Sequence, residues 1–285
     1  IMFNISCSGR KDWHYHIRDW LDLQRTHAKI HSNFEFDYEN IDYAFGVVEG
    51  HSPLKGGRIT PESVVNLTRL DEYWLYDHNI GIKMPLSSKT FSDDMYKDSL
   101  DTLKRYHRKG NGIIVATDKL AECIKNDFPD YKIEASCIQA ITDNKHYEKK
   151  VALGLYDTIV LPIHSNDDMK FIESIKRKDL LRLFMNVECS YNCPSKVCYN
   201  TTSIYNKDSA SGTATKMQCS FYDLGLERTF YNDDINWSEF YFDLPMYEKM
   251  GISNFKLVSP WEYQQRTFIM YEKNKAAMPV SIQVQ

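Results

Sequence analysis

A unit of short apolar strand, loop and helix recurs along this chain and limits the folds that it can adopt. Apolar residues at helical spacing follow each apolar run, which is the pattern of alternating strands and helices. Eight strands are predicted, at residues 2–7, 43–48, 80–86, 112–116, 132–140, 157–163, 181–187 and 254–258. The intervening helices are predicted at residues 13–21, from 60–61 onward, 93–107, 120–128, 147–156 and 168–175, with a closing helix at 261–271.

The predicted strands are nearly continuous apolar runs, as expected for a parallel sheet covered by helices on its outer face. Eight such units favour a closed α/β barrel, the (β/α)₈ or TIM-like fold. The competing fold is an open doubly wound sheet, but no Gly-x-Gly-x-x-Gly follows the first strand, and Gly56-Gly57 is too short a cradle for a dinucleotide. We therefore predict one domain over residues 1–285, with a cysteine-rich loop insert at 188–239 after the seventh strand.

Composition limits what this barrel can do. A chain of 285 residues with 42% hydrophobic content can bury a full core without disulfides. Its formal charge of −4 gives no global basic field, which argues against long non-specific tracking along nucleic acid. The sequence has no apolar run of ~20 residues and no secretory signal pattern, so we expect no membrane association and a cytoplasmic location. In that reducing compartment, seven cysteines favour metal or redox chemistry over disulfides.

Four of the cysteines follow the seventh predicted strand as Cys189-x₃-Cys193-x₄-Cys198, with Cys219 after a polar insert. Three close thiolates and one distant thiolate are typical of an iron-sulfur site, and we predict that the four share one iron-sulfur cluster. A structural zinc is the main alternative, although zinc sites prefer two tight pairs of cysteines. A chain without any metal is a further alternative. The Cys-x₃-Cys-x₂-Cys spacing of radical S-adenosylmethionine enzymes is not present here.

In a (β/α)₈ barrel the loops after the strands gather at one face, so residues near strand ends can form one site. Any one of these residues alone would ordinarily be a solvated loop residue. As candidate catalytic residues we predict Glu49, Glu134 and Lys256, with the two glutamates moving protons. Candidate substrate-binding residues are Arg10, Arg58 and His164, whose side chains suit carboxylate or phosphate groups.

Two segments carry a family resemblance. The run from Phe184 to Pro194, FMNVECSYNCP, and the run from Met250 to Leu257, MGISNFKL, resemble the cysteine loop and the Gly-Ile-x-x-Phe-Lys-Ile strand of the collagenase-like peptidase family U-32. Similar members include ubiquinone-biosynthesis accessory proteins and tRNA uridine hydroxylation proteins. The resemblance implies a barrel-like domain, a four-cysteine [4Fe-4S] cluster, and oxygen-independent hydroxylation with prephenate as the oxygen donor.

This sequence also departs from the family pattern. Family members usually spread their four cysteines more widely, and their Glu-Gly-Arg after the lysine strand is here Val258-Ser259-Pro260. The resemblance therefore supports the metal ligands Cys189, Cys193, Cys198 and Cys219 better than it supports a particular substrate.

Two functions are compatible with the predicted barrel and its cysteine segment. The first is an iron-sulfur enzyme that hydroxylates a cyclic or nucleobase substrate without molecular oxygen, with the cluster at the barrel mouth. The alternative is a non-catalytic barrel that binds a protein or nucleic acid and holds a structural zinc. The expected partner is a small-molecule or nucleobase substrate, and the sequence is also compatible with a protein partner. True peptidase activity is disfavoured, because the sequence has no Gly-x-Ser-x-Gly, no His-Glu-x-x-His and no evident Cys-His pair.

Overall fold

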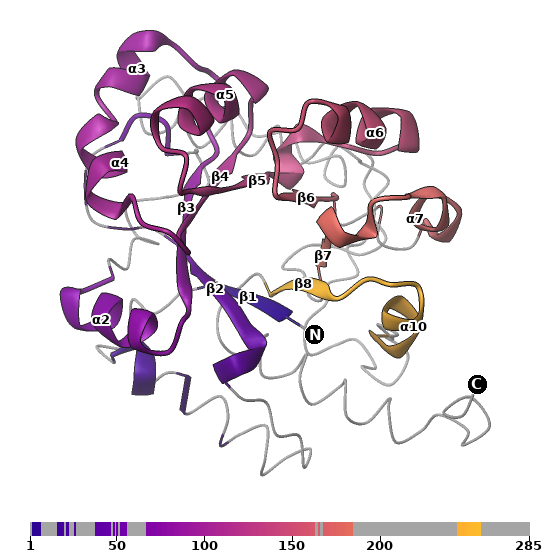
Figure 1. Ribbon diagram of the computed structural model, residues 1–285, viewed down its shortest axis with the longest axis horizontal. Coiled ribbons are helices and arrows are strands. Elements are labelled where there is room, and N and C mark those ends of the chain that lie inside the picture. Colours follow the sequence, from indigo (N-terminus) through magenta and orange to yellow (C-terminus); the bar gives the residue numbers. More distant parts are fainter. Residues whose placement is uncertain are drawn as a thin grey trace, which may run out of the picture.

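The computed structural model describes residues 2–6, 16–19, 21–22, 26, 38–46, 48, 50, 52–55, 67–162, 165, 168–184 and 244–257. Its centre is a closed barrel of eight parallel strands in sequential order (Figure 1). β1 pairs with β2 on one side and with β8 on the other, which closes the ring. The strands are β1 Met2–Ser6, β2 Ile41–Phe45, β3 Gly81–Leu86, β4 Gly112–Val115, β5 Lys132–Ala135, β6 Thr158–Val160, β7 Leu181–Phe184 and β8 Asn254–Leu257.

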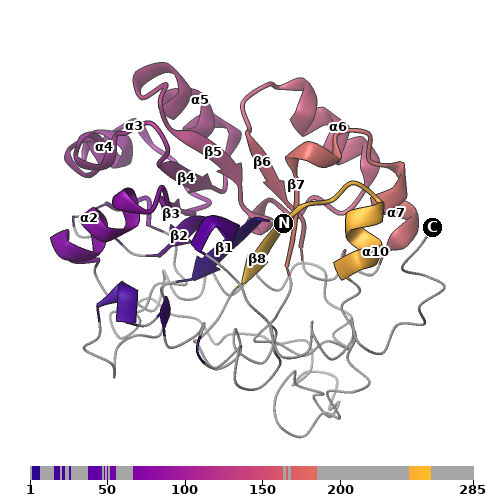
Figure 2. The same cartoon turned by 60° about the horizontal axis from the view of Figure 1, so that its bottom comes forward.

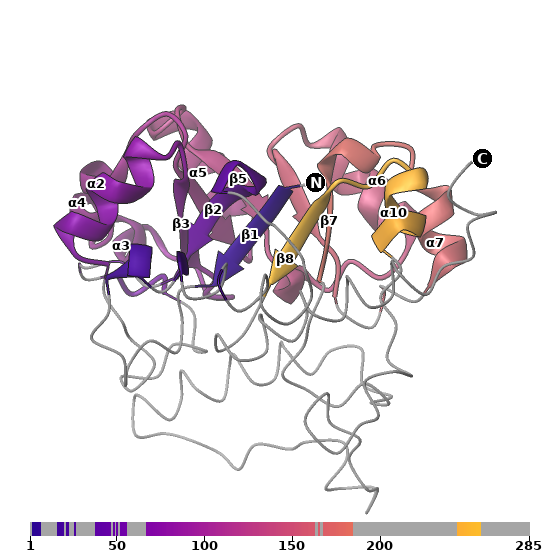
Figure 3. The ribbon, with the colours of Figure 1, turned by 90° about the horizontal axis from the view of Figure 1, so that it is seen from below.

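Helices connect the strands on the outside of this ring (Figures 1 and 2). This arrangement confirms the predicted (β/α)₈ fold. Because all eight strands are parallel, their carboxyl ends lie at one end of the barrel, as the arrowheads of β1 and β8 show in Figure 3. The helices are α2 Arg69–Asp77, α3 Asp93–Lys97, α4 Leu100–Tyr106, α5 Asp118–Asp127, α6 Asn144–Ala152, α7 Met169–Ser174 and α10 Leu244–Lys249, with short 3₁₀ helices η1 Tyr38–Asn40, η3 Cys137–Gln139 and η5 Lys178–Leu180.

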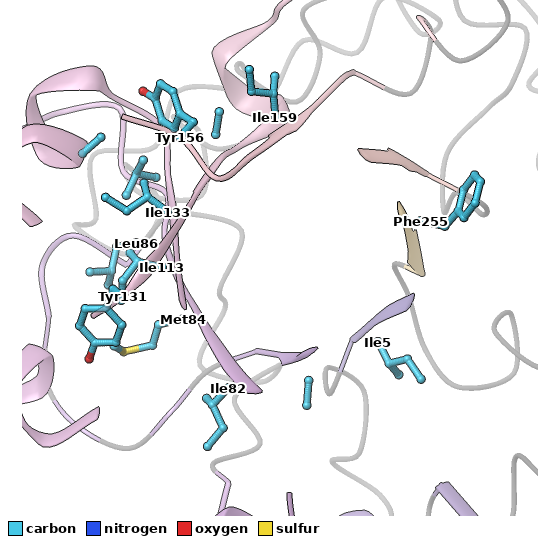
Figure 4. Close-up of a cluster of buried hydrophobic side chains, with 14 of the residues drawn as sticks. Ile5, Ile82, Met84, Leu86, Ile113, Tyr131, Ile133, Tyr156, Ile159 and Phe255 are labelled. Carbon is cyan, nitrogen blue, oxygen red and sulfur yellow. The ribbon is translucent and has the colours of Figure 1, made fainter. Parts of the chain in front are cut away.

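The apolar core lies between the strands and the helices. Figure 4 shows Ile5, Ile82 and Phe255 directed away from the inside of the ring, and each is almost completely buried. Burying an aliphatic or aromatic side chain of this size stabilises the folded state by ~1.5–3 kcal/mol. Because side chains alternate across a strand, the residues next to these in sequence face the barrel interior.

Polar side chains cap the first turns of the helices. Thr68 and Asp71 form a reciprocal capping box at the start of α2, and the Thr117 hydroxyl accepts from the Leu120 amide at the start of α5. Such caps satisfy amides that have no partner within the helix, and each typically contributes ~1 kcal/mol. Only Ala116 and Thr117 separate β4 from α5, so this short connection holds the end of β4 close to the start of α5.

One predicted helix is divided in the structure, and one predicted strand ends early. The helix predicted at 93–107 is divided into α3 and α4, where the Ser99 hydroxyl donates to the Met95 carbonyl oxygen over 2.7 Å. The strand predicted at 132–140 ends at Ala135, because Ser136 caps η3 and Ala140 then takes a left-handed φ of 53°. The described helix after β2 begins at Arg69, whereas the start predicted at 60–61 lies outside the described residues.

Two further predictions concern parts of the chain that the structure does not describe. The insert at 188–239 and the closing helix at 261–271 both lie outside the described residues. Within the residues that are described, no helix has the length and apolar character needed to cross a membrane.

Candidate functional site

The inside of the barrel contains a group of charged and polar side chains that we call the central charge cluster. Its members come from six of the eight strands and meet around one carboxylate. In its strand, each of these residues is preceded and followed by an apolar residue. They are Asn4 on β1, Asp42 on β2, Lys83 on β3, Glu134 on β5, Arg182 on β7 and Lys256 on β8.

Glu134 is the centre of this cluster and has no exposed surface. Its Oε2 accepts hydrogen bonds from Lys83 Nζ at 2.8 Å and from Arg182 Nη1 at 2.9 Å. Asn4 Nδ2 donates to the same oxygen at 3.3 Å, and Lys256 Nζ donates to Oε1 at 2.6 Å. The carboxylate therefore receives four donors, three of them cationic, which is the arrangement that makes burial of a charge tolerable.

Four members of the cluster lie on the odd-numbered strands: Asn4, Lys83, Glu134 and Arg182. The interior of a (β/α)₈ barrel is filled in layers of four side chains taken from alternate strands, and bulky aliphatic residues usually fill them. Here one entire layer is polar. A barrel that needed only a filled centre would be served as well by aliphatic side chains, so this layer is a candidate for function.

Arg182 connects the cluster to a second carboxylate. Its Nη2 donates to Asp42 Oδ2 over 3.0 Å, while Nη1 is bonded to Glu134. The Arg182 side chain is 2% exposed and that of Asp42 is 33% exposed. Three cations thus face two carboxylates in the barrel interior, which leaves an excess of one positive charge when both lysines are protonated.

The environment sets the protonation of Glu134 and Lys83, which are hydrogen-bonded to each other. Burial by itself would raise the pKa of Glu134, but the charges of Lys256, Lys83 and Arg182 hold that pKa well below its ordinary range. Burial lowers the pKa of Lys83 to about 8, with the Arg182 charge acting in the same direction and the Glu134 charge opposing it. Glu134 is therefore ionised at neutral pH, whereas Lys83 changes its protonation close to neutral pH.

Aromatic rings and a glycine shape the space around the two lysines. Lys83 Nζ lies 3.8 Å from the centre of the Tyr43 ring, and Lys256 Nζ lies 4.4 Å from the centre of the Phe45 ring. A Cβ added at Gly112 would lie 3.0 Å from Lys83 Cε and 2.8 Å from the carbonyl oxygen of Lys132. The absence of a side chain at Gly112 thus leaves room for the Lys83 stem.

Two buried polar atoms of the cluster have no hydrogen-bond partner in the described part of the chain. They are Asn4 Oδ1, an acceptor, and Arg182 Nε, a donor. Leaving such an atom unsatisfied ordinarily costs ~1–3 kcal/mol, so each is a position at which a ligand atom or a water would be stabilised.

The structure brings together two of the residues predicted from sequence, Glu134 and Lys256. Both lie inside the barrel and not at its rim, each as the third residue of a four-residue strand. Their catalytic roles stay predictions. Outside the described residues lie the other predicted site residues, namely Glu49, Arg10, Arg58, His164, Cys189, Cys193, Cys198 and Cys219.

The parts of Asn4, Asp42 and Arg182 in this cluster were not predicted from the sequence. The signal was present, because each of these polar residues interrupts an apolar strand, as Arg182 does between Leu181 and Leu183. A lone charge between buried apolar neighbours faces the barrel interior when those neighbours pack against helices. The same pattern recurs at Lys83, Glu134 and Lys256.

Metal ligands are the other part of the predicted site. Within the described residues, no group of three or more histidine, cysteine, aspartate or glutamate side chains could hold a metal ion. The cysteines among the described residues are Cys123 and Cys137, whose side chains are both partly buried, and burial raises the pKa of Cys123. These two thiols belong to α5 and η3.

Comparison with known proteins supports the fold. The structure of the U32 peptidase Mk0906 matches with a TM-score of 0.51 and 14% sequence identity, over 91% of this chain and 93% of that one. At this level of identity the likeness shows a shared fold and no more. No family model matches the sequence, and no curated protein matches it either.

Proposed function

We propose that this chain is an iron-sulfur enzyme that hydroxylates a cyclic or nucleobase substrate without molecular oxygen. One observation carries the proposal: β7 ends at Phe184, and its carboxyl end lies on the same side of the closed barrel as the carboxyl ends of the other strands. Cys189 follows five residues later in the sequence, a separation that an extended chain spans in at most ~18 Å. A cluster bound there would stand near the barrel mouth, where (β/α)₈ enzymes carry their active sites.

The ligands would be Cys189, Cys193, Cys198 and Cys219, a set of four thiolates that suits a [4Fe-4S] cluster. A bound cluster would supply one-electron redox chemistry next to the substrate. The likeness of the fold to a U32 peptidase structure agrees with the sequence resemblance to family U-32, whose members imply prephenate as the oxygen donor.

The described residues would contribute positive charge and fixed geometry. Lys256 would attract a carboxylate or phosphate of the substrate or donor, because three cations share two carboxylates in the cluster. Glu134 has a pKa well below the ordinary range, which makes it a weak proton acceptor at neutral pH. We therefore assign to Glu134 the positioning of Lys83 and Lys256, and we leave proton transfer to Glu49, with Arg10, Arg58 and His164 as further substrate-binding candidates.

The test begins with protein purified without oxygen. Iron, acid-labile sulfide and the visible absorption spectrum would be measured, followed by product analysis with an oxygen donor labelled at its hydroxyl group. We expect about four iron atoms per chain, as a [4Fe-4S] cluster requires, and label in the hydroxylated product. Colourless protein with one zinc per chain would support the non-catalytic binding barrel, and label arriving from water or molecular oxygen would contradict the proposed reaction.

A further inference from the structure

The side chains of Lys83 and Arg182 meet at one carboxylate oxygen inside the barrel, although they come from β3 and β7. Both donate to Glu134 Oε2, Lys83 through Nζ at 2.8 Å and Arg182 through Nη1 at 2.9 Å. Two donors that share one acceptor oxygen are close enough to contact adjacent groups of one small molecule. Lys256, in contrast, donates to the other oxygen of Glu134.

Arg182 retains a donor for such a molecule. Its Nη1 and Nη2 are bonded to Glu134 and Asp42, whereas its Nε has no partner in the described part of the chain. The side chain is 2% exposed, so this donor is shielded from bulk water. A carboxylate is the ligand group that best matches a guanidinium, since the charge and the planar geometry both fit.

Lys83 offers the complementary chemistry. Its pKa is lowered to about 8, chiefly by burial and also by the Arg182 charge, while Glu134 and Asp42 oppose the shift. The remaining groups around it are the Tyr43 ring, whose hydroxyl pKa is itself raised by burial, and Gly112, which carries no charge. A substantial fraction of the amine is therefore neutral near pH 8, and a neutral, desolvated amine beside other cations is a carbonyl nucleophile.

The wall of the barrel next to Lys83 reaches solvent. Pro85 lies two residues further along β3, toward the carboxyl end, and so faces the same side as Lys83. Its side chain is partly exposed, unlike that of Lys83. The carboxyl ends of the strands are the end at which (β/α)₈ barrels admit substrates.

We propose that Lys83 and Arg182 bind a small 2-oxo acid, with the Arg182 guanidinium holding its carboxylate and the Lys83 amine condensing with its carbonyl carbon to form an imine. A 2-oxo acid carries a carboxylate and a carbonyl carbon next to each other, as the adjacent pair of side chains requires. This activity goes beyond the proposed hydroxylation and does not depend on the cysteine segment.

The condensation of the Lys83 amine with the carbonyl group needs neither an oxidant nor a reductant. The Lys83 nitrogen forms a bond to the carbonyl carbon, and the carbon–oxygen bond breaks after the oxygen has been protonated. Both amine hydrogens end on that oxygen, which leaves as water. The imine carbon keeps its oxidation state, so only an added hydride donor would convert the product to a stable secondary amine.

Reductive trapping tests the proposal on the full chain. The protein is incubated at about pH 7 with pyruvate and sodium cyanoborohydride, and the modified lysines are identified by peptide mass spectrometry. Lys97 and Lys119 serve as internal comparators, since they are 69% and 63% exposed. At that pH a lysine of pKa about 8 has a neutral fraction on the order of a hundredfold larger than an ordinary lysine. We expect Lys83 to be labelled first.

Acetone, which has a carbonyl but no carboxylate, tests the part of Arg182, and we expect it to label Lys83 at least about tenfold more slowly than pyruvate. Arg182→Lys should raise the pyruvate concentration for half labelling by about tenfold or more, while the matched surface change Arg105→Lys should not. Labelling of Lys97 and Lys119 with Lys83 untouched would overturn the imine site. Equal labelling of Lys83 by pyruvate and acetone would overturn the 2-oxo acid assignment, even if Arg182→Lys does not fold.

Discussion

Lys256 Nζ lies 2.6 Å from Glu134 Oε1 and joins β8 to β5 through the inside of the barrel, although the two residues are 122 positions apart in sequence. Both were predicted from sequence as site residues at the barrel rim. Their meeting as a buried ion pair changes what Glu134 can do, because its carboxylate is held ionised by surrounding cations. The pair makes the central charge cluster important for stability as well as for any chemistry at the barrel mouth.

Replacing Glu134 with glutamine should destabilise the fold strongly. The amide has nearly the same shape but no charge, so Lys83, Arg182 and Lys256 would lose their shared counterion in a buried site. Breaking a buried ion pair from one side typically costs ~3–5 kcal/mol. The free energy of unfolding would be measured by urea denaturation.

The matched control is Asp94→Asn, because Asp94 is 90% exposed and contacts only Lys97 among the ion pairs described. This surface pair should contribute little, so the urea midpoint should stay close to that of the unmodified protein. Equal stability of Glu134→Gln and Asp94→Asn would show that the central charge cluster does not stabilise the fold.

The titration of Lys83 predicts a pH dependence of stability. Its pKa is lowered to about 8 in the folded state, against ~10.4 for an ordinary lysine. Between these values the unfolded chain binds more protons than the folded chain, so the Lys83 contribution to the free energy of unfolding rises with pH. Below about pH 8 both states are protonated, and the cost of burying the charge is fully present.

Lys83→Met removes this titration while keeping a side chain of similar length. Unfolding of the two proteins would be compared at about pH 7.5 and about pH 9.5, in the range where the linkage applies. The unmodified protein should gain stability relative to Lys83→Met as the pH rises. A difference that does not change over this range would mean that Lys83 keeps an ordinary pKa.

The fold could be predicted from the sequence because strand and helix periodicity is a local signal. Short apolar runs such as Gly112–Val115 are buried on both faces, and helical spacing between them identifies the covering layer. The break between α3 and α4 was not predicted, because the apolar spacing of Tyr96, Leu100 and Leu103 continues through it. Ser99 marks this break through a side-chain bond to the Met95 carbonyl, a competing interaction that periodicity does not register.

The central charge cluster is a non-local feature and was only partly predicted. Glu134 and Lys256 were chosen as residues near strand ends, but their contact depends on the stagger of the strands around the closed barrel. Asn4 and Glu134 show the same dependence, because they meet across the barrel from 130 positions apart. A lone charge in an apolar strand predicts an interior position, whereas the partner it meets requires the strand register.

Gly112→Ala should disturb the cluster without changing any charge. The added Cβ would lie 3.0 Å from Lys83 Cε and 2.8 Å from the Lys132 carbonyl oxygen, so the backbone or the lysine stem must move. Overpacking of this kind typically costs ~1–3 kcal/mol. Thermal unfolding measures the cost.

Gly154→Asn is the control for that change. Gly154 has a φ of 63°, which asparagine tolerates, and no atom lies within 4 Å of a Cβ added there. Its melting temperature should therefore fall less than that of Gly112→Ala. If both variants melt together, close packing against Lys83 is not what requires glycine at position 112.

Serine in place of Cys189, Cys193, Cys198 or Cys219 should lower the iron and sulfide content of protein purified without oxygen. A serine oxygen is a harder ligand than a thiolate and matches iron-sulfur poorly. Cys123→Ser and Cys137→Ser are matched controls, because these two thiols lie on α5 and η3 and belong to no metal-binding group among the described residues. Iron, sulfide and zinc are measured per chain for all six variants. Unchanged iron in the first four, or an equal loss in the two controls, would contradict the assignment; zinc lost only from the first four would favour the structural-zinc barrel.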